Sequence, residues 1–443
     1  MSERDFALYI HIPFCISKCS YCDFFSITDC GEEKLDNYID SLCKEIECRL
    51  NRFDFVDTGV NGVRDVCDVR DGVIKSIYIG GGTPSLLKEK HFEKIFDAVK
   101  TCSPAFFLAL DCEITIELNP DDVSVELLRA LWKNGVNRIS VGIQSMNDEV
   151  LKNVRRRAGR KENLEALKII SGEWKGIFSV DLISALPLES MESFEKGLEE
   201  VIKYNPHHIS LYSLTIEDET PLGKQFADGL VDYDFDFADK MWLFGRDVLE
   251  KNGYAQYEVS NFARVGYECK HNLFYWNHKP YFGCGSGGTG TLYKSDGRGL
   301  RWTNAEDVER YIQFWGEKGT ELGGKSLNLS GELPLNLPQN EEIVCLNDSK
   351  FEFFMMGLRK MCGITDLEYR QIFGEELPEK FVKLAKEWRE KGLFEIVDER
   401  LDGRLLDERP LDERPLDGSM GVRYKMSGEG ILFLNRFLSL LEL

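Results

Sequence analysis

Short apolar runs alternate with amphipathic segments along the first half of the chain. Six of these runs are rich in Ile, Val, Leu or Tyr and are bounded by Gly, Pro or Asn, which is typical of β-strands. They cover Ala7 to Phe14, Val73 to Gly80, Glu113 to Asn119, Arg138 to Gln144, Phe178 to Leu186 and His208 to Ile216. The segments that begin near Glu32, Val125 and Ser193 repeat apolar residues at three and four positions, as amphipathic helices do. Six β-then-α units predict an α/β fold with a parallel sheet, either doubly wound or curled into a barrel.

Chemically active residue types gather where the predicted strands end. Three cysteines follow the first strand, GGGTP (Gly80 to Pro84) ends the second, Glu117 and Asn119 end the third, Gln144 ends the fourth, and Asp181 lies within the fifth. In parallel α/β barrels, chemistry collects at the carboxyl ends of the strands. These strand ends together predict a single site.

After about residue 225 the pattern loosens. Residues 253 to 290 are rich in Gly and aromatics, and Leu322 to Asn347 reads as a loop. From Phe351 a helix, helix, hairpin-like order predicts a small α+β domain that resembles a winged helix. We therefore expect a core over residues 1–225, an extension over 226–345 and a C-terminal domain over 346–443. Leu406 to Asp417 contains LDERP twice, which predicts a solvated loop in the hairpin without a function of its own.

The charge balance narrows the range of partners. Lys and Arg total 55 and Asp and Glu total 76, which gives a formal net charge of -21. A surface this acidic repels phosphate backbones, so nucleic acid is not expected as a partner, although a local basic groove could escape this argument. The chain has no apolar run of about 18 residues, and its start, MSERD, lacks the features of a signal peptide. We expect a cytoplasmic location.

Three of the 13 cysteines are close in sequence, and the other ten are scattered as buried thiols usually are. Cys15, Cys19 and Cys22 form C-x3-C-x2-C, which places three thiolates on one tight loop. Thiolates are the usual protein ligands of [4Fe–4S] clusters, and three of them leave one iron open to a substrate or cofactor. Zinc is the rival, but a structural zinc site needs four ligands, and His11 would have to supply the fourth.

The run HIPFCISKCSYCDFF resembles the cluster loop of radical S-adenosylmethionine (radical SAM) proteins. Within that superfamily, HIPFC, GGGTPS, ELNP, SVGIQS, DLISALP and YSLTIEDETPL are similar to the coproporphyrinogen-oxidase-like branch, over most of residues 7 to 440. The resemblance implies a partial (β/α)6 barrel, a [4Fe–4S] cluster on Cys15, Cys19 and Cys22, and S-adenosylmethionine on the open iron.

The resemblance also implies roles for single residues. Tyr9 and Tyr21 would line the adenine and methionine of the cofactor, and Gly81, Gly82 and Thr83 would meet its amino group, where close backbone approach favours glycine. Glu117, Gln144, Arg156 and Asp181 would be its polar contacts. Asp181 could instead be a capping residue, and Arg156 could belong to a solvated basic face (Lys152 to Lys161). Relatives usually have a histidine two residues after this arginine, where this chain has Ala158.

The branch contains oxygen-independent coproporphyrinogen III oxidases, which act in porphyrin biosynthesis, and HemW-type haem chaperones. Oxidases have a fourth cysteine where this chain has Phe24, and they have a longer segment before the cluster than the 14 residues that precede Cys15. HNLFYW, from His271 to Trp276, matches the H-N-x-x-Y-W motif of the chaperones.

An imidazole can ligate haem iron while aromatic rings pack on the macrocycle, so His271 is the expected haem ligand; the alternative is a strand end with a buried aromatic pair. Related proteins often have a histidine where this chain has Thr289. We expect a carrier that gives haem to acceptor proteins and meets membranes only through them. The alternatives are the oxidase or a radical enzyme that acts on another substrate.

Overall fold

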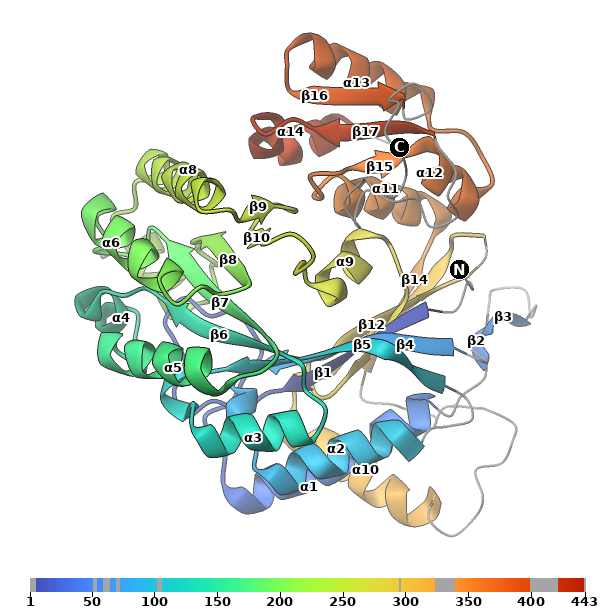
Figure 1. Ribbon diagram of the computed structural model, residues 1–443. Helices are drawn as coiled ribbons and strands as arrows, with labels where there is room; N and C mark the ends of the chain where they lie inside the picture. Colours follow the sequence, from blue (N-terminus) through green and yellow to red (C-terminus); the bar gives the residue numbers. More distant parts are fainter. Residues whose placement is uncertain are drawn as a thin grey trace.

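The computed structural model describes residues 5–50, 54–58, 64–68, 72–101, 106–294, 296–322, 339–398 and 421–441. All six expected strands are present and parallel to their neighbours, in the order β1, β4, β5, β6, β7, β8. Their bounds are Asp5–Ile12 (β1), Gly72–Gly81 (β4), Phe106–Leu118 (β5), Arg138–Gln144 (β6), Ile177–Ser184 (β7) and His208–Ser213 (β8). The sheet curves as a partial barrel, which confirms the predicted fold class (Figure 1).

Helices line the outer face of this curved sheet (Figure 1). They are α1 (Glu32–Leu50), α2 (Glu89–Thr101), α3 (Val125–Lys133), α4 (Asp148–Asn153), α5 (Arg160–Glu173), α6 (Met191–Ile202) and α8 (Phe235–Lys251). The helices expected from Glu32, Val125 and Ser193 correspond to α1, α3 and α6. Ser124 caps α3, because its side chain accepts a hydrogen bond from the Leu127 amide. Fully buried side chains such as Ile10, Ile77 and Ile116 form the core.

Side chains on the inner face of the sheet follow the two-residue period of strands. Positions 76, 78 and 80 of β4, 113, 115 and 117 of β5, and 138, 140 and 142 of β6 share that face. Many of these residues are polar, and hydrogen bonds such as Tyr78 to Glu117 and Ser140 to Asp181 join neighbouring strands. The barrel interior is therefore polar from one end of the strands to the other.

The expected extension adds strands to both edges of the same sheet. At one edge β11 (Tyr281–Cys284) pairs in parallel with β1, followed by β12 (Thr289–Tyr293), β13 (Gly299–Asn304) and β14 (Gln339–Val344). At the other edge lie β10 (Asn261–Ala263) and β9 (Ala255–Gln256). This region also holds α8, which covers the barrel, together with α9 (Lys270–Trp276) and α10 (Val308–Leu322), and α7 (Pro221–Ala227) spans its start. The prediction of a loop over Leu322 to Asn347 was wrong for its last part, because residues 339–344 form a strand that pairs with β13.

The C-terminal domain has a separate core and a three-stranded antiparallel sheet, in the order β15, β17, β16. Its elements are α11 (Leu346–Gly357), β15 (Ile364–Thr365), α12 (Asp366–Phe373), α13 (Glu379–Glu390), β16 (Phe394–Asp398), β17 (Val422–Met426) and α14 (Leu434–Leu440). This order matches the expected winged-helix-like arrangement. The LDERP repeat lies outside the described residues. A hairpin, β2 (Asp54–Thr58) and β3 (Arg64–Asp68), was not predicted. Within the described ranges, none of the helices combines the length and apolarity that crossing a membrane requires.

Candidate functional site

A cavity of about 490 Å³ opens at the carboxyl ends of the parallel strands. Its walls come from the loop after β1, the ends of β4 to β8, and the segment that contains Arg156. The predicted site residues that line this cavity are Cys15, Cys19, Tyr21, Cys22, Gly81, Gly82, Thr83, Glu117, Gln144, Arg156 and Asp181. Six separate stretches of sequence therefore meet at one place, as the strand-end pattern predicted.

Two of the three cysteines receive polar contacts from residues outside their loop. The Thr83 hydroxyl lies 3.4 Å from the Cys15 sulfur, and the Arg156 guanidinium lies 3.6 Å from the Cys19 sulfur. Burial raises the pKa of the Cys22 thiol to about 11, so in the absence of a bound metal this thiol is protonated. Donors aimed at sulfur favour the thiolate form that iron requires.

This donor set fits a [4Fe–4S] cluster better than a zinc ion. Three thiols line one cavity, which is the usual protein chemistry of such a cluster. Among the residues that the structure describes, no three His, Cys, Asp or Glu side chains are gathered so that they could hold one metal ion. His11 does not complete a zinc site, since both of its ring nitrogens lie 2.9 Å from other groups, the Tyr9 hydroxyl and the Phe25 carbonyl.

The glycine run at the end of β4 allows close backbone approach. Gly81 has φ +112°, and a Cβ there would lie 2.6 Å from the His11 ring. A Cβ on Gly82 would lie 2.6 Å from the carbonyl oxygen of Phe14, just before the first cysteine. Any other residue would push the cysteine loop away from this wall. The two glycines are therefore required by packing, whatever they contact in a ligand.

Two partly buried carboxyls line the cavity. Glu117 accepts hydrogen bonds from the Tyr78 hydroxyl (2.9 Å) and the Gly81 amide (3.1 Å). Burial, assisted by the charge of Asp181, raises the pKa of Glu117 to about 7. Burial also raises the pKa of Asp181, which accepts from the Ser140 hydroxyl at 2.9 Å. Two acids that line one cavity form a site suited to a positively charged ligand.

Gln144 and Arg156 line the cavity near the end of β6, the strand between those of Glu117 and Asp181. Gln144 ends β6 with φ +65°, an uncommon conformation for a residue other than glycine. Arg156 donates to the Asn119 side chain at 2.8 Å and to the Gly142 carbonyl, while its buried Nε atom has no partner. This arginine is only partly exposed and lines the cavity, so it is not part of a solvated face. Ala158, where relatives usually have histidine, is also buried.

Tyr9 and His271 do not line the cavity. The Tyr9 hydroxyl lies 2.9 Å from His11 inside the barrel. His271 is 1 % exposed, and its nitrogens lie 2.9 Å from the Ser76 hydroxyl and 2.8 Å from the Tyr275 hydroxyl. Burial lowers the pKa of His271 to about 3, so the ring is neutral. The motif lies on the helix α9 and not at a strand end, so that part of the alternative was wrong, although His271 has the expected buried aromatic setting. Haem ligation by His271 stays a prediction.

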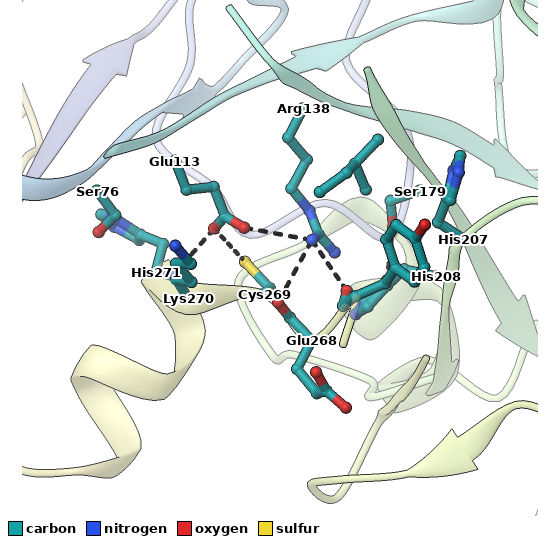
Figure 2. A network of polar contacts seen from close by, with 12 residues as sticks. Ser76, Glu113, Arg138, Ser179, His207, His208, Glu268, Cys269, Lys270 and His271 are labelled. Atoms are coloured by element: carbon teal, nitrogen blue, oxygen red, sulfur yellow. Dashed lines mark hydrogen bonds and ion pairs between the residues drawn. The ribbon is translucent and has the colours of Figure 1, made fainter. Parts of the chain in front are cut away.

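His271 belongs to a polar network inside the barrel, shown in Figure 2. Its amide donates to Glu113 at 3.2 Å, and Glu113 pairs with Arg138 at 3.3 Å. The Cys269 thiol lies 3.5 Å from the same carboxylate. Arg138 also donates to the Tyr267 carbonyl, so the chain leading into α9 is fixed to β5 and β6. This network fills the interior below the cavity.

Sequence reasoning missed two aromatic residues of the cavity, Tyr78 and Tyr212. The signal was available, because Tyr78 has the same strand parity as Gly80 and Tyr212 comes near the end of β8. It also missed the Glu113–Arg138 pair, whose partners are 25 residues apart in sequence. Thr289, where relatives often have histidine, lies in β12 and contacts the Thr303 hydroxyl at 2.9 Å.

Comparison with known proteins agrees with this architecture. The family model of the radical SAM superfamily matches residues 9–201. The chain is 35 % identical to the haem chaperone HemW of Escherichia coli, over 82 % of this chain and 85 % of that protein. It is 30 % identical to HemW of Bacillus subtilis, over 87 % of this chain and 91 % of that one.

A solved structure shows the same fold. Coproporphyrinogen III oxidase (HemN) from E. coli aligns with a TM-score of 0.71 and 19 % identity, covering 99 % of this chain and 90 % of the oxidase. At this identity the likeness establishes the architecture alone. The sequence relationship is more specific, because its identity is higher and it spans most of both chains. The chain belongs to the HemW family of radical SAM proteins.

Proposed function

We propose that this protein is a haem carrier that holds a [4Fe–4S] cluster with S-adenosylmethionine and gives haem to acceptor proteins. The observation that carries the proposal is the cavity that is lined both by three thiols from one short loop and by the carboxyls of Glu117 and Asp181. Phe24, at the position where oxidases have a fourth cysteine, lines the same cavity and is 65 % exposed. The relatives named haem chaperones support the carrier function.

The cluster and S-adenosylmethionine would be held by different residues of the cavity. Cys15, Cys19 and Cys22 would bind three irons of the cluster, with Thr83 and Arg156 as donors to two of the sulfurs. A cluster held in this way supplies one open iron to a cofactor.

The cofactor would meet the other walls. Its cationic groups suit the Glu117 and Asp181 carboxyls, and the flat glycine wall at Gly81 and Gly82 leaves room for its amino group. Gln144 and Tyr21 line the remaining surface. Tyr9 would act only through His11, since its hydroxyl is already bonded inside the barrel.

Haem ligation by His271 would require a rearrangement of α9. Each ring nitrogen already has a hydrogen-bond partner, so binding iron through either one would replace the contact with Ser76 or with Tyr275. The helix is only seven residues long and is joined to the barrel through polar contacts, which cost less to exchange than a packed apolar core. We therefore propose that haem binding displaces α9 from its position in this structure.

A haem titration of the full chain, reconstituted anaerobically, tests the proposal. We expect saturation at about one haem per chain, with a defined Soret maximum. Cys15→Ala should still bind haem, because His271 contacts Ser76 inside the barrel and does not line the cavity of the cysteine loop. Featureless, non-saturating absorbance would reject the carrier function.

A further inference from the structure

The imidazole of His11 lies at the end of β1, four residues before the first cysteine, and is 4 % exposed. Its Nε2 is 2.9 Å from the Phe25 carbonyl oxygen, and its Nδ1 is 2.9 Å from the Tyr9 hydroxyl. A carbonyl oxygen can only accept, so Nε2 carries the hydrogen, and Nδ1 of the neutral ring accepts from Tyr9. Burial lowers the pKa of His11, which keeps the ring in this neutral form.

Phe25 is where the three-cysteine loop returns to the barrel. Its ring stacks on the His11 imidazole with centroids 6.4 Å apart and planes at 24°. Gly287 approaches the Phe25 ring so closely that a Cβ would lie 2.8 Å from it. Two residues later, the Ile27 carbonyl accepts from the Cys15 amide (2.9 Å), and the Ile27 amide donates to Pro13 (2.8 Å). The entry and exit of the loop are thus joined beside His11.

The same imidazole also supports the glycine wall. Gly81 packs against the His11 ring, with no room for a Cβ. The Gly81 amide donates to Glu117, 3.1 Å away. His11 therefore touches the cysteine loop through Phe25 and the carboxyl-bearing wall through Gly81, and the sequence motifs assign it no role in either.

We propose that His11 is a positioning residue, which fixes the return of the three-cysteine loop at Phe25 against the Gly81 end of β4 and so sets the three thiols relative to Glu117. The contacts of His11 with Tyr9 and Phe25 form in the protein without any ligand. Its consequence for the cofactor rests on the proposed function, which places the cluster and S-adenosylmethionine in this cavity.

Two substitutions separate the loop contact from the Tyr9 contact. In His11→Gln the side-chain amide nitrogen reaches about as far as Nε2 and can still donate to Phe25. In His11→Asn the amide ends near the place of Nδ1 and cannot reach that carbonyl. The control is His91→Asn in α2, because His91 is also fully buried with both nitrogens bonded, to the Lys88 amide (3.0 Å) and to Asp36 (2.6 Å).

Amide hydrogen exchange of the cluster-free protein measures the loop contact. In His11→Asn the Cys15 and Ile27 amides should exchange at least fivefold faster than in wild type, the effect of losing about one hydrogen bond. His11→Gln should stay within twofold, and His91→Asn should leave these two amides unchanged. Exchange in His11→Asn within twofold of wild type would overturn the proposal. If His11→Asn does not fold, His11→Leu replaces it, because leucine fills a similar volume but cannot donate to Phe25; at least a fivefold increase is expected, and no change would count against the proposal.

Cofactor binding to the reconstituted protein measures the consequence. S-adenosylmethionine is titrated while the electron paramagnetic resonance spectrum of the reduced cluster is followed. His11→Asn should keep the wild-type iron content and need at least fivefold more cofactor, and His11→Gln should restore the wild-type titration. Unchanged affinity in His11→Asn would overturn the effect on the thiols and Glu117. A wild-type protein that takes up no iron would refute the proposed function, while the exchange measurement would still decide the role of His11.

Discussion

Burial controls the charge of individual side chains in the cavity. The carboxyl of Glu117 and the thiol of Cys22 both have pKa values raised by burial, to about 7 and about 11. Without ligands, the site therefore tends toward neutrality, because isolated charges are costly in a closed space. A cationic cofactor and a metal cluster would reverse this tendency. Single substitutions can thus separate the requirements of folding from those of binding.

The proposed cluster depends on three particular thiols. Cys15→Ala, Cys19→Ala or Cys22→Ala should abolish the uptake of about four irons and four sulfides per chain, since the cluster binds through thiolates. Cys43→Ala is the matched control: Cys43 is also a partly buried cysteine without a disulfide, but it lies on α1. Iron and sulfide analysis after anaerobic reconstitution measures the outcome. Stoichiometric zinc without iron uptake would contradict the cluster.

Glu117 should make stability depend on pH. A carboxyl whose pKa rises from 4.5 to about 7 on folding holds its proton more tightly in the folded chain. Its contribution is therefore fully present below pH 4.5 and is lost as the pH rises through 7. Relative to wild type, Glu117→Gln should gain about 1–3 kcal/mol of unfolding free energy between pH 5 and pH 8.

Chemical denaturation of cofactor-free protein at the two pH values gives this difference. Glu192→Gln serves as the control, because Glu192 is solvent-exposed and its pKa is lowered by Lys196. Equal pH dependence in Glu117→Gln and wild type would show that the carboxyl is ionised in the folded protein.

Among the elements, α9 connects the barrel with the C-terminal domain (Figure 1). On one side His271 contacts Ser76 of β4. On the other side the Arg359 guanidinium lies 5.4 Å from the centroid of the Trp276 ring, and Lys360 donates to Asn277, which follows the helix. A change in the position of α9 would therefore alter contacts with both the barrel and the C-terminal domain.

Two substitutions at α9 distinguish a haem ligand from a structural histidine. His271→Ala leaves the Ser76 and Tyr275 hydroxyls without their partner, so it should lower the unfolding free energy by about 2–4 kcal/mol. Ser76→Ala removes only one of these hydrogen bonds and should cost about 1 kcal/mol. If His271 ligates haem, only His271→Ala should shift the Soret band and weaken binding. Identical haem spectra in both variants would limit His271 to the structural role.

The parallel strands were predictable because each is an apolar run bounded by turn residues, and strand ends then placed Glu117, Gln144 and Asp181 in one cavity. Local pattern could not place Tyr9 and His271. Both residues stand among residue types that are typical of a ligand site, but the Tyr9–His11 and Ser76–His271 contacts lie inside the barrel. Side-chain direction in such cases depends on partners far away in sequence, such as Ser76, 195 residues from His271.

At the scale of the whole molecule, one sheet carries both the core and the extension, and the C-terminal domain adds a second core. The barrel holds the cavity at the carboxyl ends of its strands and the polar network of His271, Glu113 and Arg138 in its interior. Two chemically different regions therefore share one barrel. The formal net charge of -21 favours acceptor surfaces that are basic or neutral. This arrangement suits a carrier in which the cluster and the haem occupy separate places.

The most direct test of the carrier function is turnover of coproporphyrinogen III. The full chain with its cluster, a reductant and S-adenosylmethionine is incubated anaerobically with this substrate, and protoporphyrinogen IX is measured beside a haem titration of the same preparation. Our account predicts about one haem bound per chain and no product above a Cys15→Ala control. Sustained formation of protoporphyrinogen IX by the wild-type protein, abolished in Cys15→Ala, would contradict it.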